Sequence, residues 1–580
     1  MDTFKSFKGY GKVDEANEQA FRKKTRRRLI IAGVSFVVLL LIIAGAIAGT
    51  IISKRSSGSK SSASAPPATE VTPATSLKAV CSVTEYPDSC FSSISSYETA
   101  NTTDPKQLFK LSLQVAVREV ENFANYVSTA AAKINSDNQT KAAVEVCGAV
   151  IDDAASQLND SVSLMDAKSG ESLSTAKISD MRTWLSSTIT NLDTCLDSLE
   201  EMNSTLLGEF KARVENSTEF TSNSLAIVTK ILNVLSNLNI PIHRKLLGSG
   251  DFPAWVRPAD RRLLQDDAAF TPNVTVAKDG SGDCLTIKEA VDKVPKKSTS
   301  RFIIHVKAGK YVENVVMDKN KWNVMMYGDG KDKSIVSGSL NFVDGTPTFS
   351  TATFAVAGKG FIVRDMGFIN TAGAEKHQAV AFRSGSDMSV MYRCSFDAFQ
   401  DTLYAHSNRQ FYRDCDVTGT IDFVFGNSAS VFQNCKIMPR QPMANQFNTI
   451  TAQGKKDPNQ NTGISIQKCT ISVNGNVTAP TYLGRPWKVY STTVIMQSTI
   501  GTFLHPRGWM EWVRGVDPPG TINYGEYLNT GPGASTAQRV TWAGYKPALT
   551  ASEAAKFTVE QFIEGSNWLP QASVTFDSTL

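Results

Sequence analysis

Histidine is scarce in this sequence, and its scarcity narrows the chemistry that the chain can use. Only five histidines occur among 580 residues, and no two have the spacing of paired metal ligands. A Gly-x-Ser-x-Gly motif is also lacking, which excludes the usual nucleophile elbow of serine esterases. The net charge is only +5, so charge alone indicates no partner. We expect no metal, no organic cofactor and no nucleic acid.

One long uncharged run lies near the N-terminus. It extends from Leu29 to Ile52 behind a basic block, Arg22–Arg28, and is long enough to cross a bilayer of about 30 Å. The heavier positive flank is N-terminal, which predicts that residues 1–28 are cytoplasmic and that the rest is lumenal or extracellular. The run therefore predicts a transmembrane signal anchor.

Cysteines and glycosylation motifs agree with a lumenal body. Nine cysteines suit disulfides in an oxidising compartment, with one thiol left over. Asn-x-Ser/Thr motifs occur only after the uncharged run, at Asn101, Asn138, Asn159, Asn203, Asn216, Asn273 and Asn476. Both features indicate a glycoprotein of the secretory pathway.

Composition and periodicity divide the remaining chain into four segments. Residues 53–76 are rich in Ser, Ala and Pro and predict a flexible stalk. Residues 77–240 carry apolar residues at helical spacing and predict a helical bundle. Residues 241–265 break the pattern, and residues 266–580 are rich in short β-like runs.

Four cysteines lie in the predicted bundle. Cys147 and Cys195 each fall on the apolar stripe of a predicted helix, where a bridge between two helices is feasible, and Cys81 and Cys90 are close enough to close a small hairpin. This pattern, with the motif Thr84–Cys90, resembles the plant pectin methylesterase and invertase inhibitor family. The alternative interpretation is a folding or spacer domain without inhibitory contact.

Two dibasic-dileucine motifs lie in the segment 241–265, at Arg244–Leu247 and Arg261–Leu264. Basic residues in an exposed, proline-bearing linker are good protease targets. The motifs resemble the processing sites of precursor pectin methylesterases, so we expect a processing protease to cut at Arg261–Leu264. A solvated charge run is the alternative.

The C-terminal segment, 266–580, contains a repeated sequence pattern. An apolar strand followed by a short polar or cysteine residue recurs, and Cys394, Cys415 and Cys435 are 21 and 20 residues apart. Such periods indicate a solenoid, and a unit built only of strands and turns stacks as a right-handed parallel β-helix. Coils about 4.8 Å apart would bring stacked cysteines together, which predicts the disulfides Cys394–Cys415 and Cys435–Cys469 and leaves Cys284 free.

The same register places two carboxylates side by side. Asp401 lies seven residues after Cys394, and Asp422 lies seven after Cys415. Two carboxylates about 5 Å apart do not both ionise readily, so one is expected to hold a proton while the other is charged. Gln378 lies about one coil before Asp401. From spacing alone, a solvated or cation-paired aspartate ladder on one face of the β-helix is the alternative.

Four blocks in the ladder resemble the signatures of pectin methylesterases. They are Gln378–Ala381, Gln400–Tyr404, Asp422–Gly426 and Leu483–Trp487, in the order and spacing of that family. The resemblance extends over about 274–570 and implies hydrolysis of the C6 methyl esters of pectin. Phe382 stands where Leu is usual, and Cys284 where the family has no cysteine.

The resemblance also implies roles. Asp422 is the expected nucleophile, and Asp401 the acid and base. Gln378 and Gln400 are expected to form an oxyanion hole, and Arg485 to hold the nucleophile. The expected substrate-binding residues are Thr348, Gln378, Tyr404, Phe425, Arg485 and Trp487.

Two other classes compete with this interpretation. A pectin-cleaving glycosidase or lyase also uses a β-helix with close carboxylates, and a catalytically inactive wall-binding protein would act through its helical domain. The expected partners are pectin, the processing protease, proteinaceous inhibitors of the same family as the N-terminal domain, and a membrane through Leu29–Ile52. The expected locations are a membrane-anchored precursor and a mature enzyme in the cell wall.

Overall fold

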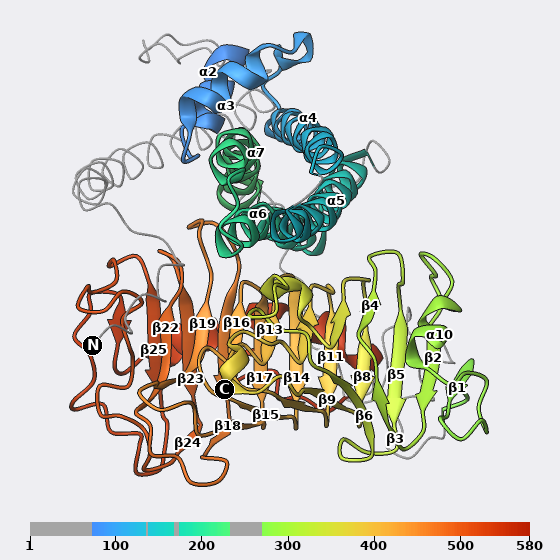
Figure 1. Ribbon diagram of the computed structural model, residues 1–580. Helices are drawn as coiled ribbons and strands as arrows, with labels where there is room; N and C mark the ends of the chain where they lie inside the picture. The colour runs from blue at the N-terminus through green and yellow to red at the C-terminus, as the bar shows by residue number, and fades with distance from the viewer. Residues whose placement is uncertain (1–71, 135–136, 167–172, 233–269, 573) are drawn as a thin grey trace, which may run out of the picture.

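The computed structural model describes residues 72–134, 137–166, 173–232, 270–572 and 574–580. A group of helices lies on one side of a long ladder of short strands (Figure 1). The predicted transmembrane segment, the linker 241–265 and residues 53–71 of the predicted stalk lie outside the described residues, whereas residues 73–76, predicted as stalk, begin helix α2 (Pro73–Cys81).

The helical part begins with local capping signals. The Thr72 side chain caps α2, and Pro105 begins α4 behind the Asp104 cap. The elements are α2 (Pro73–Cys81), α3 (Pro87–Ser95), η1 (Glu98–Ala100), α4 (Pro105–Ala131), α5 (Asn138–Asp166), α6 (Thr175–Glu201), α7 (Leu207–Ile227) and η2 (Val228–Leu232). Disulfides join Cys81 to Cys90 and Cys147 to Cys195, so both bridges suggested by the sequence are confirmed.

The ladder is a parallel β-helix of three sheets, as the cysteine period predicted. The 11-stranded sheet contains, in spatial order, β1 (Val274–Val276), β2 (Phe302–Val306), β5 (Val324–Gly328), β8 (Ile362–Arg364), β11 (Ser389–Tyr392), β14 (Arg409–Arg413), β17 (Ala429–Gln433), β20 (Gly463–Gln467), β23 (Thr492–Met496), β25 (Asn523–Tyr527) and β26 (Tyr545–Lys546). The 8-stranded sheet contains β24 (Thr499–Ile500), β21 (Thr470–Ile471), β18 (Lys436–Pro439), β15 (Asp416–Gly419), β12 (Ser395–Asp397), β9 (Gly367–Asn370), β6 (Ser334–Gly338) and β3 (Gly309–Val312). The 7-stranded sheet contains β22 (Thr481–Pro486), β19 (Asn448–Gln453), β16 (Val424–Gly426), β13 (Leu403–Ala405), β10 (Phe382–Ser384), β7 (Phe354–Val356) and β4 (Val315–Met317).

The interior of the β-helix is filled by side chains that stack from coil to coil. Phe354 stacks on Phe382 with ring centres 5.6 Å apart, and Phe368 stacks on Phe396 at 5.7 Å. The main core of buried apolar residues runs from Val274 to Tyr545 and includes no residue of the helical part. The short helix α10 (Ile287–Asp292) packs into the same core beside β1 and β4.

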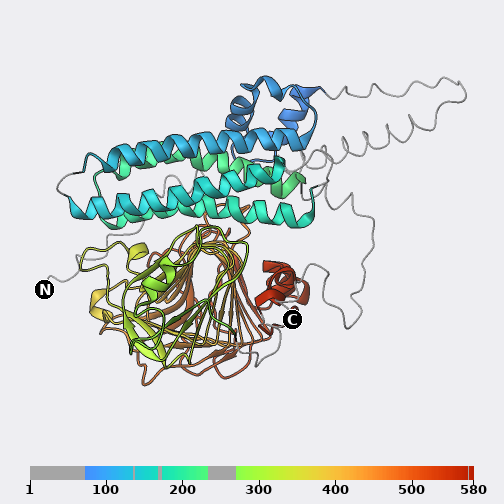
Figure 2. The same ribbon diagram turned by 90° about the vertical axis from the view of Figure 1, so that its right-hand side faces the viewer.

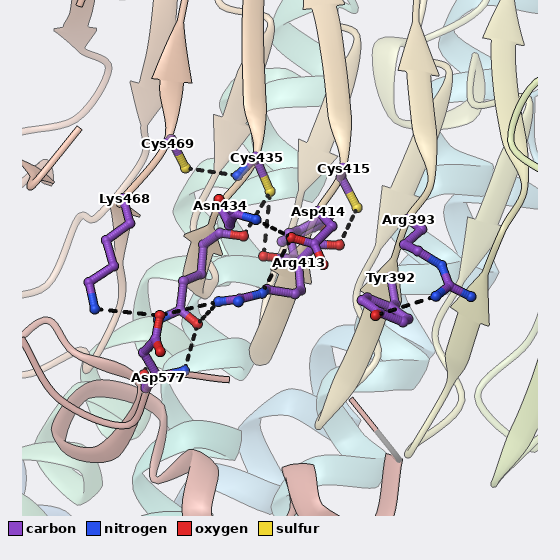
Figure 3. A network of polar contacts seen from close by, with 12 residues as sticks. Tyr392, Arg393, Arg413, Asp414, Cys415, Asn434, Cys435, Lys468, Cys469 and Asp577 are labelled. Atoms are coloured by element: carbon purple, nitrogen blue, oxygen red, sulfur yellow. Dashed lines mark hydrogen bonds and ion pairs between the residues drawn. The ribbon is translucent and has the colours of Figure 1, made fainter. Parts of the chain in front are cut away.

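The predicted cysteine pairs of the ladder are wrong. Cys394, Cys415, Cys435 and Cys469 are all buried as free thiols, and Cys284 is free as well. In-register stacking keeps the Cα–Cβ bonds of neighbouring coils parallel, so the Cβ atoms stay about 4.8 Å apart, beyond the usual 3.5–4.5 Å of a disulfide. Figure 3 shows three of these thiols, Cys415, Cys435 and Cys469, side by side on neighbouring strands. The Cys435 amide donates to Cys469 Sγ at 3.3 Å.

Left-handed turns precede these cysteines. The turn residues Arg393, Asp414, Asn434 and Lys468 all have φ between 52° and 55°. Asn434 donates to Asp414 at 2.5 Å, and Asp577 of the C-terminal segment lies 3.4 Å from both Arg413 and Lys468 (Figure 3). The repeated turn therefore sets the register of the ladder, and the C-terminal segment is anchored along it.

The predicted fold class needs one correction. It included a transmembrane helix, but no helix within the described ranges is long and apolar enough to cross a membrane.

The long helices run across the axis of the β-helix, as the end-on view shows (Figure 2). Helices α5 and α6 lie nearest to it, above the strands of the 7-stranded sheet (Figure 1). The short helix α12 (Val559–Ile563) packs instead against β17 of the 11-stranded sheet. The helical part therefore covers one face of the β-helix, the face from which the predicted site residues come.

Candidate active site

Asp401 and Asp422 lie on neighbouring coils in the same register. Each precedes a strand of the 7-stranded sheet by two residues, and Leu403 of β13 pairs with Val424 of β16. Both aspartates adopt left-handed backbone, with φ of 63° and 52°, and both are buried. Asp and Asn tolerate this conformation better than most residues. The turn thus brings two carboxylates to the same edge of the sheet.

The two carboxylates have different partners. Arg485 on β22 donates to Asp422 from Nε and from Nη2, the latter at 2.6 Å. The paired guanidinium hydrogen bonds hold a charged carboxylate in place. Asp401 has different surroundings. Burial raises its pKa well above the usual range, and the charges of Asp422 and Glu201 raise it further. The two carboxyl groups therefore differ: Asp422 is paired with a guanidinium, whereas Asp401 has a raised pKa.

Thr449 is a second hydrogen-bonding partner of Asp422, besides Arg485. Its hydroxyl donates to Asp422 Oδ1 at 2.6 Å and accepts the Asp422 amide N–H at 2.9 Å. Thr449 stands on β19, the coil after Asp422, and is fully buried. The contact fixes the orientation of the carboxylate, so Thr449 is a positioning residue.

We expect Thr449→Val to lower kcat about tenfold to a hundredfold with little change in KM. A hydrogen bond to a charged group contributes about 1.5–3 kcal/mol, and Val keeps the branched shape of Thr. Initial-rate kinetics on esterified pectin, the substrate expected from the sequence, measure the effect, with Thr418→Val on the neighbouring 8-stranded sheet as the matched control. An equal loss in both variants would mean that the hydroxyl acts only through stability.

Aromatic side chains line the same face. Tyr404 and Phe425 stack with ring centres 4.2 Å apart, and Trp487 lies 6.4 Å from Phe425. Trp512 extends this group, since Arg485 lies 4.2 Å from its ring centre. Aromatic faces of this kind suit the apolar faces of sugar rings.

The predicted amide donors come together as well. Gln378 and Gln400 form a parallel β-bridge, so they occupy adjacent coils just before the Asp401 turn. Both are half-buried. In the part of the chain that the structure describes, no group of three or more His, Cys, Asp or Glu is placed to hold a metal ion.

Helix α6 reaches this site from the helical part. Glu201, its last residue, accepts hydrogen bonds from the amide (3.0 Å) and the hydroxyl of Thr348. Farther along the helix, Thr194 bonds His406 and Thr190 accepts from Asn427, both at 2.9 Å. The face that carries the aspartates is thus covered by α6.

Sequence reasoning missed four residues of this site. Thr449 could have been found by extending the coil register past the loop that follows β18. Phe447 and Trp512, which flank Arg485, carry no spacing signal. Glu201 could not have been found, because its place depends on how two separately patterned segments dock.

Comparison with known proteins identifies the family to which this fold and site belong. A parallel β-helix that carries two carboxyl groups with unequal surroundings beside aromatic rings defines a class of carboxylate-bearing β-helix proteins. The family model described as Pectinesterase matches residues 273–566, and that of Plant invertase/pectin methylesterase inhibitor matches residues 75–227. The chain belongs to the pectinesterase family: it is a carboxylic ester hydrolase that acts on pectin, with an inhibitor-like N-terminal domain.

Full-length relatives support the assignment. Pectinesterase 3 of Phaseolus vulgaris is 62% identical over 587 residues, covering 100% of both chains. Pectinesterase 1 of Arabidopsis thaliana is 60% identical over 590 residues, covering 99% of each. Among solved structures, the pectin methylesterase from carrot is 50% identical, with a TM-score of 0.53, and matches 54% of this chain and 100% of its own.

Proposed function

We propose that Asp422 is the nucleophile of ester hydrolysis and that Asp401 transfers the protons. Asp422 attacks C6 of a methyl-esterified galacturonate, and the oxyanion that forms is stabilised by the amides of Gln378 and Gln400. Asp401 gives its proton to the departing methoxide, and methanol leaves. Asp401 then takes a proton from water, whose oxygen attacks C6 and releases Asp422. The sugar carboxylate is the second product.

The observation that carries this proposal is the unequal surroundings of the two carboxylates. Arg485 holds Asp422 in two hydrogen bonds, whereas burial and neighbouring charge favour a proton on Asp401. Methanol release measured together with the viscosity of esterified pectin tests it. We expect methanol without a loss of viscosity. Falling viscosity would indicate a glycosidase or lyase, and neither signal would indicate a binding protein.

We propose further that the helical domain, 77–240, is a pro-region that blocks the site until the linker 241–265 is cut. The support is the position of α6, whose Glu201 occupies the backbone amide and hydroxyl of Thr348, a proposed substrate contact. Cleavage after Arg261–Leu264 would release a chain that begins near Gln265 and contains the β-helix domain, 266–580, as the active enzyme. The sequons and cysteine content suggest that this happens in the secretory pathway, with the mature enzyme acting in the cell wall.

Docking of the helical domain should weaken as pH rises from about 5 to above 7. Burial raises the pKa of Glu201 to about 7 and that of Asp197 to about 6 in the docked state. A raised pKa in the docked state stabilises docking below the group's free pKa, and the stabilisation is lost as pH rises through the docked value. Size-exclusion chromatography of the linker-cut chain should show one species near pH 5 and two near pH 8.

Glu201→Gln is the matched variant, because it keeps the hydrogen-bonding shape but does not titrate. Its docking should lose part of the pH dependence, with the remainder due to Asp197 and other buried acids of the interface. An identical pH profile for wild type and Glu201→Gln would contradict the role of Glu201.

A further inference from the structure

A row of cations on the β-helix lies under the helical domain, and each pairs with a carboxylate from that domain. The four lysines follow strands of the 7-stranded sheet, Arg409 begins β14, and the carboxylate partners come from α5 and α6. The pairs are Lys319 with Asp152, Lys359 with Asp160, Arg409 with Asp180, Lys456 with Asp193, and Lys488 with Asp197. The face that meets substrate is therefore matched by negative charge from the helical domain.

Lys456 and Lys488 differ from Arg409 in one respect. Arg409 also binds Asp387 of the β-helix itself, at 2.7 Å. Every carboxylate that contacts Lys456 or Lys488 in the described residues comes from α6: Asp197 lies 2.7 Å and Asp193 lies 3.6 Å from Lys488 Nζ. When α6 leaves, these two ammonium groups lose their carboxylate partners together.

Both lysines lie close to the proposed reaction centre. Lys456 follows β19 and Lys488 follows β22, the two strands beyond β16 on the side of Asp422. Along α6, Asp197 is one turn and Asp193 about two turns before Glu201, or about 6 and 12 Å at 1.5 Å per residue. Lys488 also follows Arg485, which holds Asp422, by only three residues. The carboxylates that bind the two lysines thus lie on the same helix as Glu201, which contacts Thr348.

The surroundings of Lys488 fit a sugar acid. Its Nζ lies 4.9 Å from the ring centre of Trp487, the residue next to it in the chain. An aromatic face beside an ammonium group offers an apolar surface to a sugar ring and a cation to its carboxylate. A methyl-esterified sugar has no charge to offer Lys488, whereas a de-esterified sugar does.

We propose that Lys488, with Lys456, forms a subsite for the free carboxylate of a de-esterified galacturonate, and that Asp197 and Asp193 of α6 occupy this subsite in the intact chain. The proposal rests on the proposed function, since it needs pectin on this face. Each turnover creates a carboxylate of the kind that the subsite binds. The enzyme should therefore favour esters that neighbour sugars already de-esterified.

Steady-state kinetics on two substrates test the proposal: nearly fully methylated pectin and partly de-esterified pectin. Wild type, Lys488→Gln and the double variant Lys456→Gln/Lys488→Gln are cut within 241–265 and freed of the helical part, because the β-helix has a core of its own. The preference is the kcat/KM on partly de-esterified pectin divided by the kcat/KM on nearly fully methylated pectin. This ratio should fall about tenfold in Lys488→Gln and further in the double variant, because charge-assisted hydrogen bonds to the free carboxylate are lost. Circular dichroism checks the fold, and Lys436→Gln, an exposed lysine on the 8-stranded sheet, is the matched control.

Oligogalacturonate without methyl groups provides a second readout. It should inhibit wild type competitively, and its inhibition constant should rise about tenfold in Lys488→Gln. The subsite would be overturned if Lys488→Gln had the same kcat/KM ratio and the same inhibition constant as the control Lys436→Gln. An equal loss of kcat/KM on the two pectins would overturn it as well. If wild type released no methanol from either pectin, the proposed function would fail instead, and the subsite with it.

Discussion

Asp422→Asn should reduce methanol release by several orders of magnitude. The substitution replaces a charged oxygen nucleophile with a neutral amide, and Asp401, the adjacent carboxyl, is arranged to hold a proton rather than to attack. Arg485 would then lie beside a neutral amide instead of a charged carboxylate. Methanol measured over hours, with enzyme at high concentration, gives the residual rate.

The fold should survive this change. Asn is nearly isosteric with Asp and tolerates the left-handed backbone found at Asp422 (φ 52°). Asp414→Asn is the matched control, because Asp414 has almost the same φ (55°) and lies at another turn of the same coil. Near-normal turnover in folded Asp422→Asn would place the reaction elsewhere.

Asp401→Asn should cost about 10²- to 10⁴-fold, the usual value of proton transfer by a positioned side chain. The nucleophile stays, but methoxide must leave without a proton and water must attack without a base. The loss should therefore be large but smaller than that of Asp422→Asn. Methanol release across a range of pH measures it.

The pH profile separates this role from a structural one. In the intact chain burial and the charges of Asp422 and Glu201 raise the pKa of Asp401. Asp422 stays beside Asp401 when α6 leaves, so the activity of the freed β-helix should follow the titration of Asp401. That dependence should be absent in Asp401→Asn. A parallel profile at a lower rate would mean that Asp401 supports the site without moving protons.

Much of the fold was predictable because a β-helix repeats its register. Once Cys394, Cys415 and Cys435 set the period, the stacking of Asp401 on Asp422 followed, and the pairing of Leu403 with Val424 agrees with it. The same regularity misled the cysteine prediction, because stacking fixes the direction of a side chain as well as its spacing. Proximity of Cα atoms alone does not make a disulfide.

The docking of the helical domain was not predictable from patterns along the chain. Periodicity reports the buried face of each helix, and α6 has buried polar residues, such as Thr190 and Asp193, that look like surface positions in the sequence. They are buried because they meet the β-helix. Only the structure relates Glu201 to Thr348 or Asp197 to Lys488.

The central claim is that ester hydrolysis takes place at the aspartate pair that α6 covers. The most direct measurement is methanol release from esterified pectin by one preparation, before and after the segment 241–265 is cut and the helical part removed. We expect a low rate in the intact chain and a rise of at least tenfold after removal, with no rise in Asp422→Asn. An intact chain as active as the freed β-helix would contradict the account.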